Sequence, residues 1–346
     1  MSRSFLIKLL VAFIVLIVLI TGFTLFRTYR KIYYPNVVTH GNPSEFIYIP
    51  TGSTFEDVMD TLYKNNYIID KGSFEWMCEK KTYKKNIFPG RYRIRNNMSN
   101  NDLINILRSG KQEPVKIVII KTRKIETLAG RIGRKIEADS LSVITLLNNY
   151  ELISTYGFNT ETVPAMFIPN TYKFFWNTSA QEFLDRMHNE YVKFWNDSRK
   201  AKAAALNLTP VEVTILASIV TEESAKPLEY GTIAGVYINR IRKGMKLQAD
   251  PTVKFAMGDF ALKRILLKHL QYDSPYNTYV YAGLPPGPIC IPDPVVIDAV
   301  LNYTPHTYIY FCAKADMSGY HTFARTLVQH NKNARAYQAA YDKMQK

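Results

Sequence analysis

Two adjacent carboxylates at the end of an apolar segment are the residues of this sequence that most directly suggest chemistry. Glu222 and Glu223 follow a segment in which Ile215, Ile219 and Val220 form an apolar arc. At about 100° per residue on a helix, Glu223 falls between Ile219 and Val220, and Glu222 falls at the edge of the apolar face. A buried, unpaired carboxyl group has a raised pKa and stays protonated. Such a group can act as the general acid in glycosidic bond cleavage. The alternative is a structural glutamate that pairs with Lys or Arg, and the helix alone favours this alternative.

The segment that carries these carboxylates has the signals of a helix start and a helix stop. Thr209 is a typical N-cap, Pro210 suits the first helical position, and Glu212 completes a capping box. Pro227 ends the segment. The sequence therefore predicts a helix that positions Glu223 in its last turn.

Other catalytic motifs are absent from the sequence. It has no Gly-x-Ser-x-Gly nucleophile elbow, no phosphate-binding glycine loop and no His-Glu-x-x-His. Its three cysteines, Cys78, Cys290 and Cys312, are far apart and show no metal-ligand spacing. We therefore expect neither a metal ion nor a cofactor.

Polar and aromatic residues gather downstream of the predicted helix. Their amides, hydroxyls and rings suit a neutral sugar polymer, which needs hydrogen bonds and flat apolar surfaces. The candidate substrate-binding residues are Gln248, Asp250, Tyr276, Asn277 and His321. Each also has a structural interpretation, for example Asp250 and Asn277 as turn caps and the Pro/Gly run 283–289 as a rigid loop.

The N-terminus has the composition of a membrane anchor. Residues 9–26 are long and apolar enough to cross a bilayer. A cleaved signal peptide is the alternative, but the segment lacks a small-x-small cleavage site and ends at Arg27. Basic residues flank both ends, so charge does not decide the orientation. Residues 27–44 are polar and basic, and we predict a linker there.

Length and charge give broader limits. A chain of 346 residues has room for this anchor and two domains. The net charge of +15 is compatible with anionic lipids or an anionic cell-wall polymer. No helix-turn-helix, zinc-finger or RNP motif accompanies the charge, so we do not expect nucleic-acid binding.

The remaining elements predict an α+β fold. Residues 45–115 have the pattern strand–helix–helix–strand–helix, which is typical of a small α+β module. The alternative is that they form the N-terminal lobe of one larger domain. A strand over 115–120 opens the region 116–346, for which we predict a long helix over 182–202, a helix over 230–241 and a mostly irregular C-terminal third. That third includes a strand near 308–311 and a terminal helix from residue 333.

Taken together, these segments resemble the YceG-like family of membrane-anchored endolytic murein transglycosylases (MltG type). The resemblance is carried by LASIVTEES (216–224), VYINR (236–240), MKLQADPT (245–252), YNTY (276–279), GLPPGPI (283–289) and HTF (321–323). A looser likeness over 45–115, in YIPTG (48–52) and GRY (90–92), is similar to the family's LysM-like subdomain.

The resemblance implies lytic cleavage of the MurNAc–GlcNAc β-1,4 bond within peptidoglycan strands, with Glu223 as the catalytic acid and then base. It implies a cytoplasmic segment 1–8, a LysM-like subdomain over 45–115, and a mixed α/β catalytic domain over 116–346 with a central catalytic helix. This domain would lie on the periplasmic or extracellular side of the cytoplasmic membrane. The implied partners are peptidoglycan glycan strands and, through a role in ending nascent strands, peptidoglycan synthases such as penicillin-binding proteins.

The sequence departs from the family at two positions. The family motif has a first glutamate where this chain has Thr221, and an aspartate where it has Asn170. A charge at position 170 is therefore not expected to matter here. Two alternatives stay open: Asp250 as a second carboxylate would make a hydrolase, and loss of catalysis would leave a wall-binding scaffold.

Overall fold

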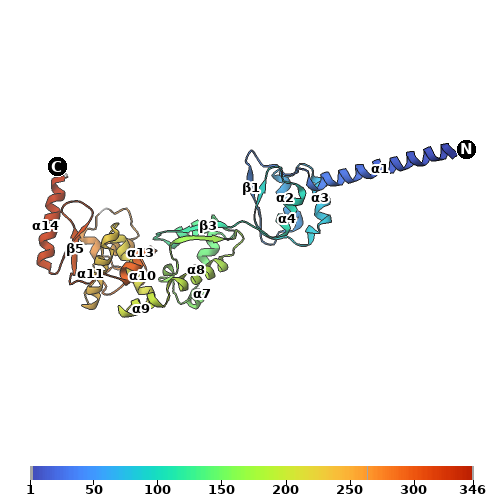
Figure 1. The fold of residues 1–346 in the computed structure, drawn as a ribbon. Coiled ribbons are helices and arrows are strands. Elements are labelled where there is room, and N and C mark those ends of the chain that lie inside the picture. Colours follow the sequence, from blue (N-terminus) through green and yellow to red (C-terminus); the bar gives the residue numbers. More distant parts are fainter. Residues whose placement is uncertain (1–2, 263, 345–346) are drawn as a thin grey trace. The chain divides into compact units, whose positions relative to one another are not determined.

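A computed structural model describes residues 3–262 and 264–344 of the chain (Figure 1). These residues form two compact units. Unit 1 comprises residues 1–115 together with 173–178, and unit 2 comprises 116–172 together with 179–346. The chain is α+β as predicted, with many helices and small two-stranded sheets.

Unit 1 begins with a long apolar helix. Its elements are α1 (Arg3–Tyr33), β1 (Ser44–Ile49), α2 (Phe55–Lys64), α3 (Lys71–Lys80), β2 (Gly90–Arg95) and α4 (Asn100–Arg108). The predicted order strand–helix–helix–strand–helix is confirmed, and β1 pairs with β2 in antiparallel register from Ser44↔Arg95 to Ile49↔Gly90. Helix α1 is long and apolar enough to span a membrane.

The predicted linker is partly helical, which corrects the sequence analysis. Helix α1 continues to Tyr33 because unit 1 packs against its end. The Asn100 amide donates to the Lys31 carbonyl at 2.9 Å, and the Lys31 ammonium lies 5.3 Å from the centre of the Trp76 ring. These contacts hold a basic helical segment that composition alone assigns to a linker.

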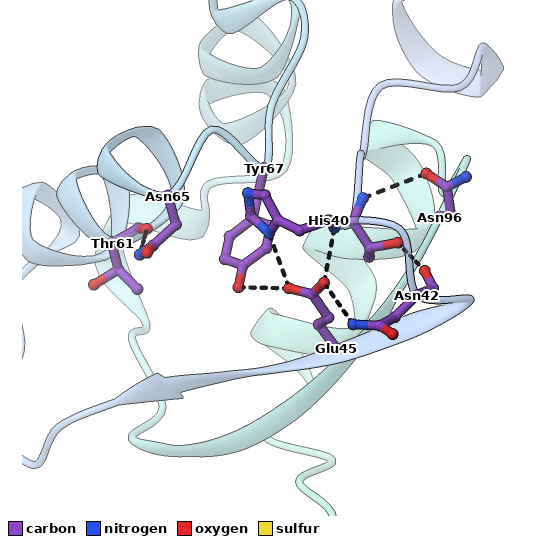
Figure 2. Close-up of polar contacts among 8 residues, drawn as sticks. His40, Asn42, Glu45, Thr61, Asn65, Tyr67 and Asn96 are labelled. Atoms are coloured by element: carbon purple, nitrogen blue, oxygen red, sulfur yellow. Dashed lines mark hydrogen bonds and ion pairs between the residues drawn. The ribbon is translucent and has the colours of Figure 1, made fainter.

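Glu45 organises the segment that follows α1 (Figure 2). Its carboxylate accepts hydrogen bonds from the His40 backbone N–H at 2.7 Å and from the Tyr67 hydroxyl at 3.0 Å. Bonds from the His40 ring and backbone, Tyr67 and Asn42 outweigh the effect of burial and lower the pKa of Glu45 to about 2. The start of β1 is thereby fixed to the preceding turn and to the loop between α2 and α3.

Unit 2 is mainly helical. Strands β3 (Val115–Ile119) and β4 (Asn170–Phe174) form a two-stranded sheet. The other elements are α5 (Ile125–Gly133), α6 (Ser140–Leu147), α7 (Tyr150–Thr155), α8 (Ala180–Phe194), α9 (Asp197–Ala205), α10 (Pro210–Glu223), α11 (Tyr230–Arg242), α12 (Asp250–Met257), α13 (Pro294–Leu301), β5 (Tyr310–Ala313), β6 (His321–Ala324) and α14 (Leu327–Met344). The core of unit 2 is built mainly by α10, α11 and α13.

Three expectations for unit 2 were wrong. The single helix over 182–202 is two helices, α8 and α9, because Asn196 caps the second by accepting the Arg199 N–H at 3.0 Å. The C-terminal third contains α12 and α13, which the sequence analysis missed. Both helices start with an Asp-Pro pair, Asp250-Pro251 and Asp293-Pro294, and Pro suits the first turn of a helix. Helix α14 starts earlier than predicted.

Candidate active site

Helix α10 positions the candidate acid. The Thr209 hydroxyl accepts the Glu212 N–H at 3.2 Å, and the Glu212 carboxylate accepts the Thr209 N–H at 2.7 Å, so the predicted capping box is confirmed. Residues 213–220 are all buried. The helix is therefore covered on every side, whereas the sequence predicted a single apolar face.

Glu223 is the last residue of α10 and is partly buried at the wall of a pocket. The Tyr237 hydroxyl donates a hydrogen bond of 2.5 Å to Glu223 Oε1. Burial raises the pKa of Glu223 to about 7; the nearby charge of Asp250 acts in the same direction, and Tyr237, Arg240 and Lys254 oppose it. Near neutral pH this carboxyl group exists in both protonation states, which a group that donates and then accepts a proton needs.

Glu222, its neighbour, has a different environment. Lys121 Nζ lies 3.0 Å from Glu222 Oε1, and Arg123 Nη2 lies 2.6 Å from Oε2. Burial would raise the pKa of Glu222, but the hydrogen bonds from Arg123 and Lys121 outweigh it and lower the pKa. Glu222 is thus the structural, paired glutamate that the sequence analysis considered for this helix end.

Two further residues of α11 support Glu223, and the sequence analysis assigned them no role. Tyr237 is buried, with its ring at 5.8 Å and 89° to that of Phe311. Arg240 is buried and donates to the carbonyls of Ile309 at 2.7 Å and Leu247 at 2.8 Å. Their spacing of three residues on a helix, with polar ends in an apolar face, was the available signal.

The pocket at Glu223 has a volume of about 730 Å³ and lies within unit 2. It mixes acidic, basic and aromatic side chains. Its lining residues are Arg123, Glu222, Glu223, Asp250, Pro251, Lys254, Phe255, Phe260, Arg264, Ile265, Ile289, Tyr337, Gln338 and Tyr341. A volume of this size accommodates sugar units.

Asp250 is the predicted substrate-binding residue that shares this pocket. It is exposed at the start of α12, and its Oδ1 accepts a hydrogen bond of 2.7 Å from the Tyr279 hydroxyl. Gln248 is also exposed, two residues earlier. Its backbone has φ +52°, and its Oε1 accepts from Arg240 Nη1 at 3.2 Å. A left-handed backbone at a non-glycine residue is a strained feature that often marks functional segments.

The other three candidates lie elsewhere. Tyr276 lines a second pocket of about 500 Å³, with its ring 4.8 Å from that of Phe255. Asn277 is fully buried, and its amide donates to the carbonyls of Leu270 and Tyr272 at 3.1 and 2.8 Å, which is the turn-capping geometry. His321 lies on β6, and its Nδ1 is 2.9 Å from Glu229 Oε2.

Asn170, where the sequence departs from the resembled family, is exposed at the start of β4. Its Oδ1 accepts the Thr171 N–H at 2.7 Å. The residue does not belong to the lining of the pocket at Glu223.

Comparisons with known proteins agree on one family. A model described as the YceG-like family matches residues 47–336. An endolytic murein transglycosylase of Bacillus subtilis (strain 168) is 29% identical over 310 residues, covering 84% of both chains. One of Streptococcus pneumoniae R6 is 26% identical over 319 residues, which are 82% of this chain and 57% of the relative. A crystal structure of a YceG-like protein from Listeria monocytogenes is similar at 26% identity, with a TM-score of 0.56, and covers 84% of this chain and 98% of that one.

Proposed function

Because the chain belongs to the YceG-like family, we propose that it is a membrane-anchored lytic transglycosylase that cleaves the MurNAc–GlcNAc β-1,4 bond within peptidoglycan strands. The observation that carries the proposal is Glu223, a partly buried carboxyl group with a pKa of about 7 at a sugar-sized pocket. The names of the relatives supply the polymer and the endolytic mode.

Glu223 performs both proton transfers in this proposal. As the neutral acid it donates its proton to the glycosidic oxygen while the bond from C1 of MurNAc to that oxygen breaks. The resulting carboxylate takes the proton of the muramic acid O6 hydroxyl as O6 attacks C1. One strand end becomes a 1,6-anhydro ring and the other a free GlcNAc hydroxyl, no water is consumed, and Glu223 is protonated again.

The neighbouring residues suit these two stages. The hydrogen bond from Tyr237 stabilises the carboxylate form, in which Glu223 acts as a base. Positive charge develops at C1 as the bond breaks, and the carboxylates of Asp250 and Glu223 in one pocket favour it electrostatically. Asp250 therefore has a role that requires no attack on the sugar.

The test compares two adjacent glutamates. Full-length protein in detergent micelles, with Glu223→Gln or Glu222→Gln, is incubated with purified peptidoglycan, and the products are identified by mass spectrometry. We expect the first variant to lose about 100-fold or more of the release of anhydro-muropeptides, because it cannot exchange the proton. The second variant is the matched control and keeps most activity. Undiminished release by Glu223→Gln would refute the assignment.

The same products separate the alternatives. A hydrolase that uses Asp250 as a second carboxylate would leave reducing ends, whereas the lytic reaction leaves anhydro ends. A non-catalytic scaffold would release neither.

The remaining proposals concern the whole chain. The strand–helix–helix–strand order of unit 1 supports a LysM-like, wall-binding module over 45–115, followed by the catalytic domain over 116–346. Peptidoglycan lies outside the cytoplasmic membrane, so we place the segment before the anchor in the cytoplasm and both units outside. An activity that cuts strands beside the membrane would end nascent strands, and would work next to peptidoglycan synthases.

A further inference from the structure

Helix α14 forms one wall of the catalytic pocket although it belongs to no core. It lies beside β5 and β6 (Figure 1), where the ring of His330 stacks on Tyr310 at 5.3 Å and 24°. None of its residues is buried. The family match ends at residue 336, so the second half of this helix lies beyond the part of the chain that the family model covers.

Two tyrosines of this second half face the pocket. Tyr337 and Tyr341 are four residues apart and therefore lie on one face of the helix. Both line the pocket that contains Glu223, with ring centroids 6.2 Å apart and an interplanar angle of 32°. Tyr341 is 42% exposed, and Tyr337 is partly buried. The two rings thus present aromatic surface to a cavity rather than to the protein interior.

Aromatic surface of this kind contributes little to folding, because burial of apolar area is what stabilises a fold. It is well suited to the apolar C–H faces of a pyranose ring, and the exposed Gln338 beside it lines the same pocket. Arg264 and Lys254 line the same pocket and add cationic groups to its wall. A glycan whose sugars carry carboxylate-bearing lactyl groups matches this mixture of surfaces.

We infer that Tyr337 and Tyr341 form an aromatic wall that binds one saccharide unit of the glycan strand whose bond Glu223 cleaves. The inference rests on the proposed function for the identity of the ligand. The wall contributes binding in the ground state and the transition state alike, so it acts on KM and on strand affinity rather than on kcat. Tyr337 and Tyr341 are binding residues and take no part in proton transfer.

The experiment measures binding separately from cleavage. In full-length Glu223→Gln protein in detergent micelles, Tyr337 and Tyr341 are both changed to Leu or both to Phe. Affinity for purified, peptide-free glycan strands is measured by titration calorimetry. Leu keeps apolar bulk but has no flat face, so we expect about tenfold weaker binding, while the Phe pair binds within about twofold of the parent. Val328→Ala, an 81% exposed residue of the same helix outside the pocket lining, is the control for α14 itself.

Each outcome bears on a separate claim. Unchanged affinity of the Leu pair would refute the wall, as would equal losses in the Leu pair and in Val328→Ala. With Glu223 intact, the Leu pair should raise KM about tenfold and leave kcat within about twofold. If Glu223→Gln still cleaves strands while the Leu pair loses affinity, the proposed catalyst is wrong and the wall stands.

Discussion

Glu222 and Glu223 show that surroundings, more than residue type, decide what a carboxyl group can do. Two cations lower the pKa of Glu222, whereas burial raises that of Glu223 to about 7. Both glutamates end the same helix, and they differ by about 100° in direction. This difference decides which of them meets Lys121 and Arg123 and which meets Tyr237.

In the proposed mechanism the acidic form of Glu223 starts the reaction, so activity should fall as pH rises through about 7. This decrease is the alkaline limb of the pH profile. Tyr237→Phe removes the hydrogen bond that favours the carboxylate of Glu223, so it should raise the pKa of Glu223 and move the alkaline limb to higher pH. Asp250→Asn removes a negative charge that raises the pKa, and should move the limb to lower pH. We expect shifts of about half a pH unit or more in kcat/KM profiles.

Glu222→Gln is the control for both variants and should leave the alkaline limb in place. Shifts of the same sign in Tyr237→Phe and Asp250→Asn would contradict the electrostatic account. The readout is the position of the limb, so a lower maximal rate in either variant does not affect it.

The raised pKa also has a stability cost. Below pH 4.5 the Glu223 carboxyl group is protonated in both the folded and the unfolded state, so it does not affect the free energy of unfolding. Between pH 4.5 and 7 the folded state keeps a proton that the unfolded state has lost, so the folded state becomes less stable as pH rises. Above pH 7 this loss of stability has reached its full size. Glu223→Gln should therefore be more stable than the parent by about 1–3 kcal/mol at pH 8, and equally stable at pH 4.

Thermal unfolding of both proteins at the two pH values checks this prediction. Glu222→Gln should show the opposite sign at pH 8, because the glutamate it removes is ion-paired. Equal midpoints for Glu223→Gln and the parent at pH 8 would mean that Glu223 is not desolvated.

At the level of elements, α10 is positioned by a loop far away in sequence. The buried Ser218 hydroxyl accepts the Ile289 N–H at 3.0 Å and donates to the Ile215 carbonyl at 2.6 Å. Ile289 is the last residue of the Pro/Gly run 283–289, in which Gly287 approaches the backbone of Glu161. A Cβ at Gly287 would lie 2.0 Å from the Glu161 carbonyl oxygen. The run is thus a loop that contacts α10 through Ile289 and packs closely against Glu161, and its rigidity stays a prediction.

Gly287→Ala should therefore shift this loop and lower both stability and activity, since the contact is to backbone that cannot rotate away. We expect a loss of about 1–3 kcal/mol, measured by thermal unfolding. Gly130→Ala is the matched control: a Cβ there meets nothing within 4 Å in α5, and it should stabilise by about 0.5–1 kcal/mol. An unperturbed Gly287→Ala protein would show that the loop has room to move.

The sequence was informative for elements that carry their own start and stop signals. Thr209, Pro210 and Glu212 define α10 locally, and Ser99 does the same for α4. It was less informative where partners come from elsewhere in the chain. The hydrogen bond from Tyr237 to Glu223 and the buried amide of Asn277 depend on how helices and turns meet, which periodicity does not encode. Asn277 and Asp250 had the same sequence interpretation as turn caps, yet Asn277 is buried and Asp250 lines the pocket.

At the scale of the molecule, the units are not consecutive stretches of sequence. Unit 1 takes residues 173–178 from the middle of unit 2, and the Trp176 ring lies 5.0 Å from that of Tyr48, at 64°. Gln112 donates to Asn177 at 2.9 Å within the same unit. The boundaries of the LysM-like subdomain, 45–115, and of the catalytic domain, 116–346, therefore stay predictions. A fragment that ends at residue 115 would lack part of the packing of unit 1.

The end of α1 is attached to the rest of unit 1 through Asn100, whose amide also donates to Ser73 at 3.0 Å and accepts from Asn36 at 2.6 Å. Asn100→Ala should release the last turns of α1, because Asn36 and Ser73 lose a buried partner. We expect trypsin to cut after Arg27, Arg30 or Lys31 about tenfold faster in liposome-reconstituted protein. Asn65→Ala, which removes an exposed bond to Thr61 (Figure 2), is the control, and equal rates in the two variants would contradict the attachment.

This attachment makes the transmembrane helix continuous with the rest of unit 1, without a flexible linker between them. A helix of 31 residues is about 46 Å long, of which about 30 Å crosses the apolar part of a bilayer. With the predicted span over residues 9–26, residues 27–33 of α1 lie between the lipid and the rest of unit 1, which is about two turns of helix. A flexible linker would instead allow the part of unit 1 that follows α1 to reach a wide range of distances from the membrane. If both units lie outside the membrane, as proposed, the short helical connection holds that part of unit 1 within a few nanometres of the lipid.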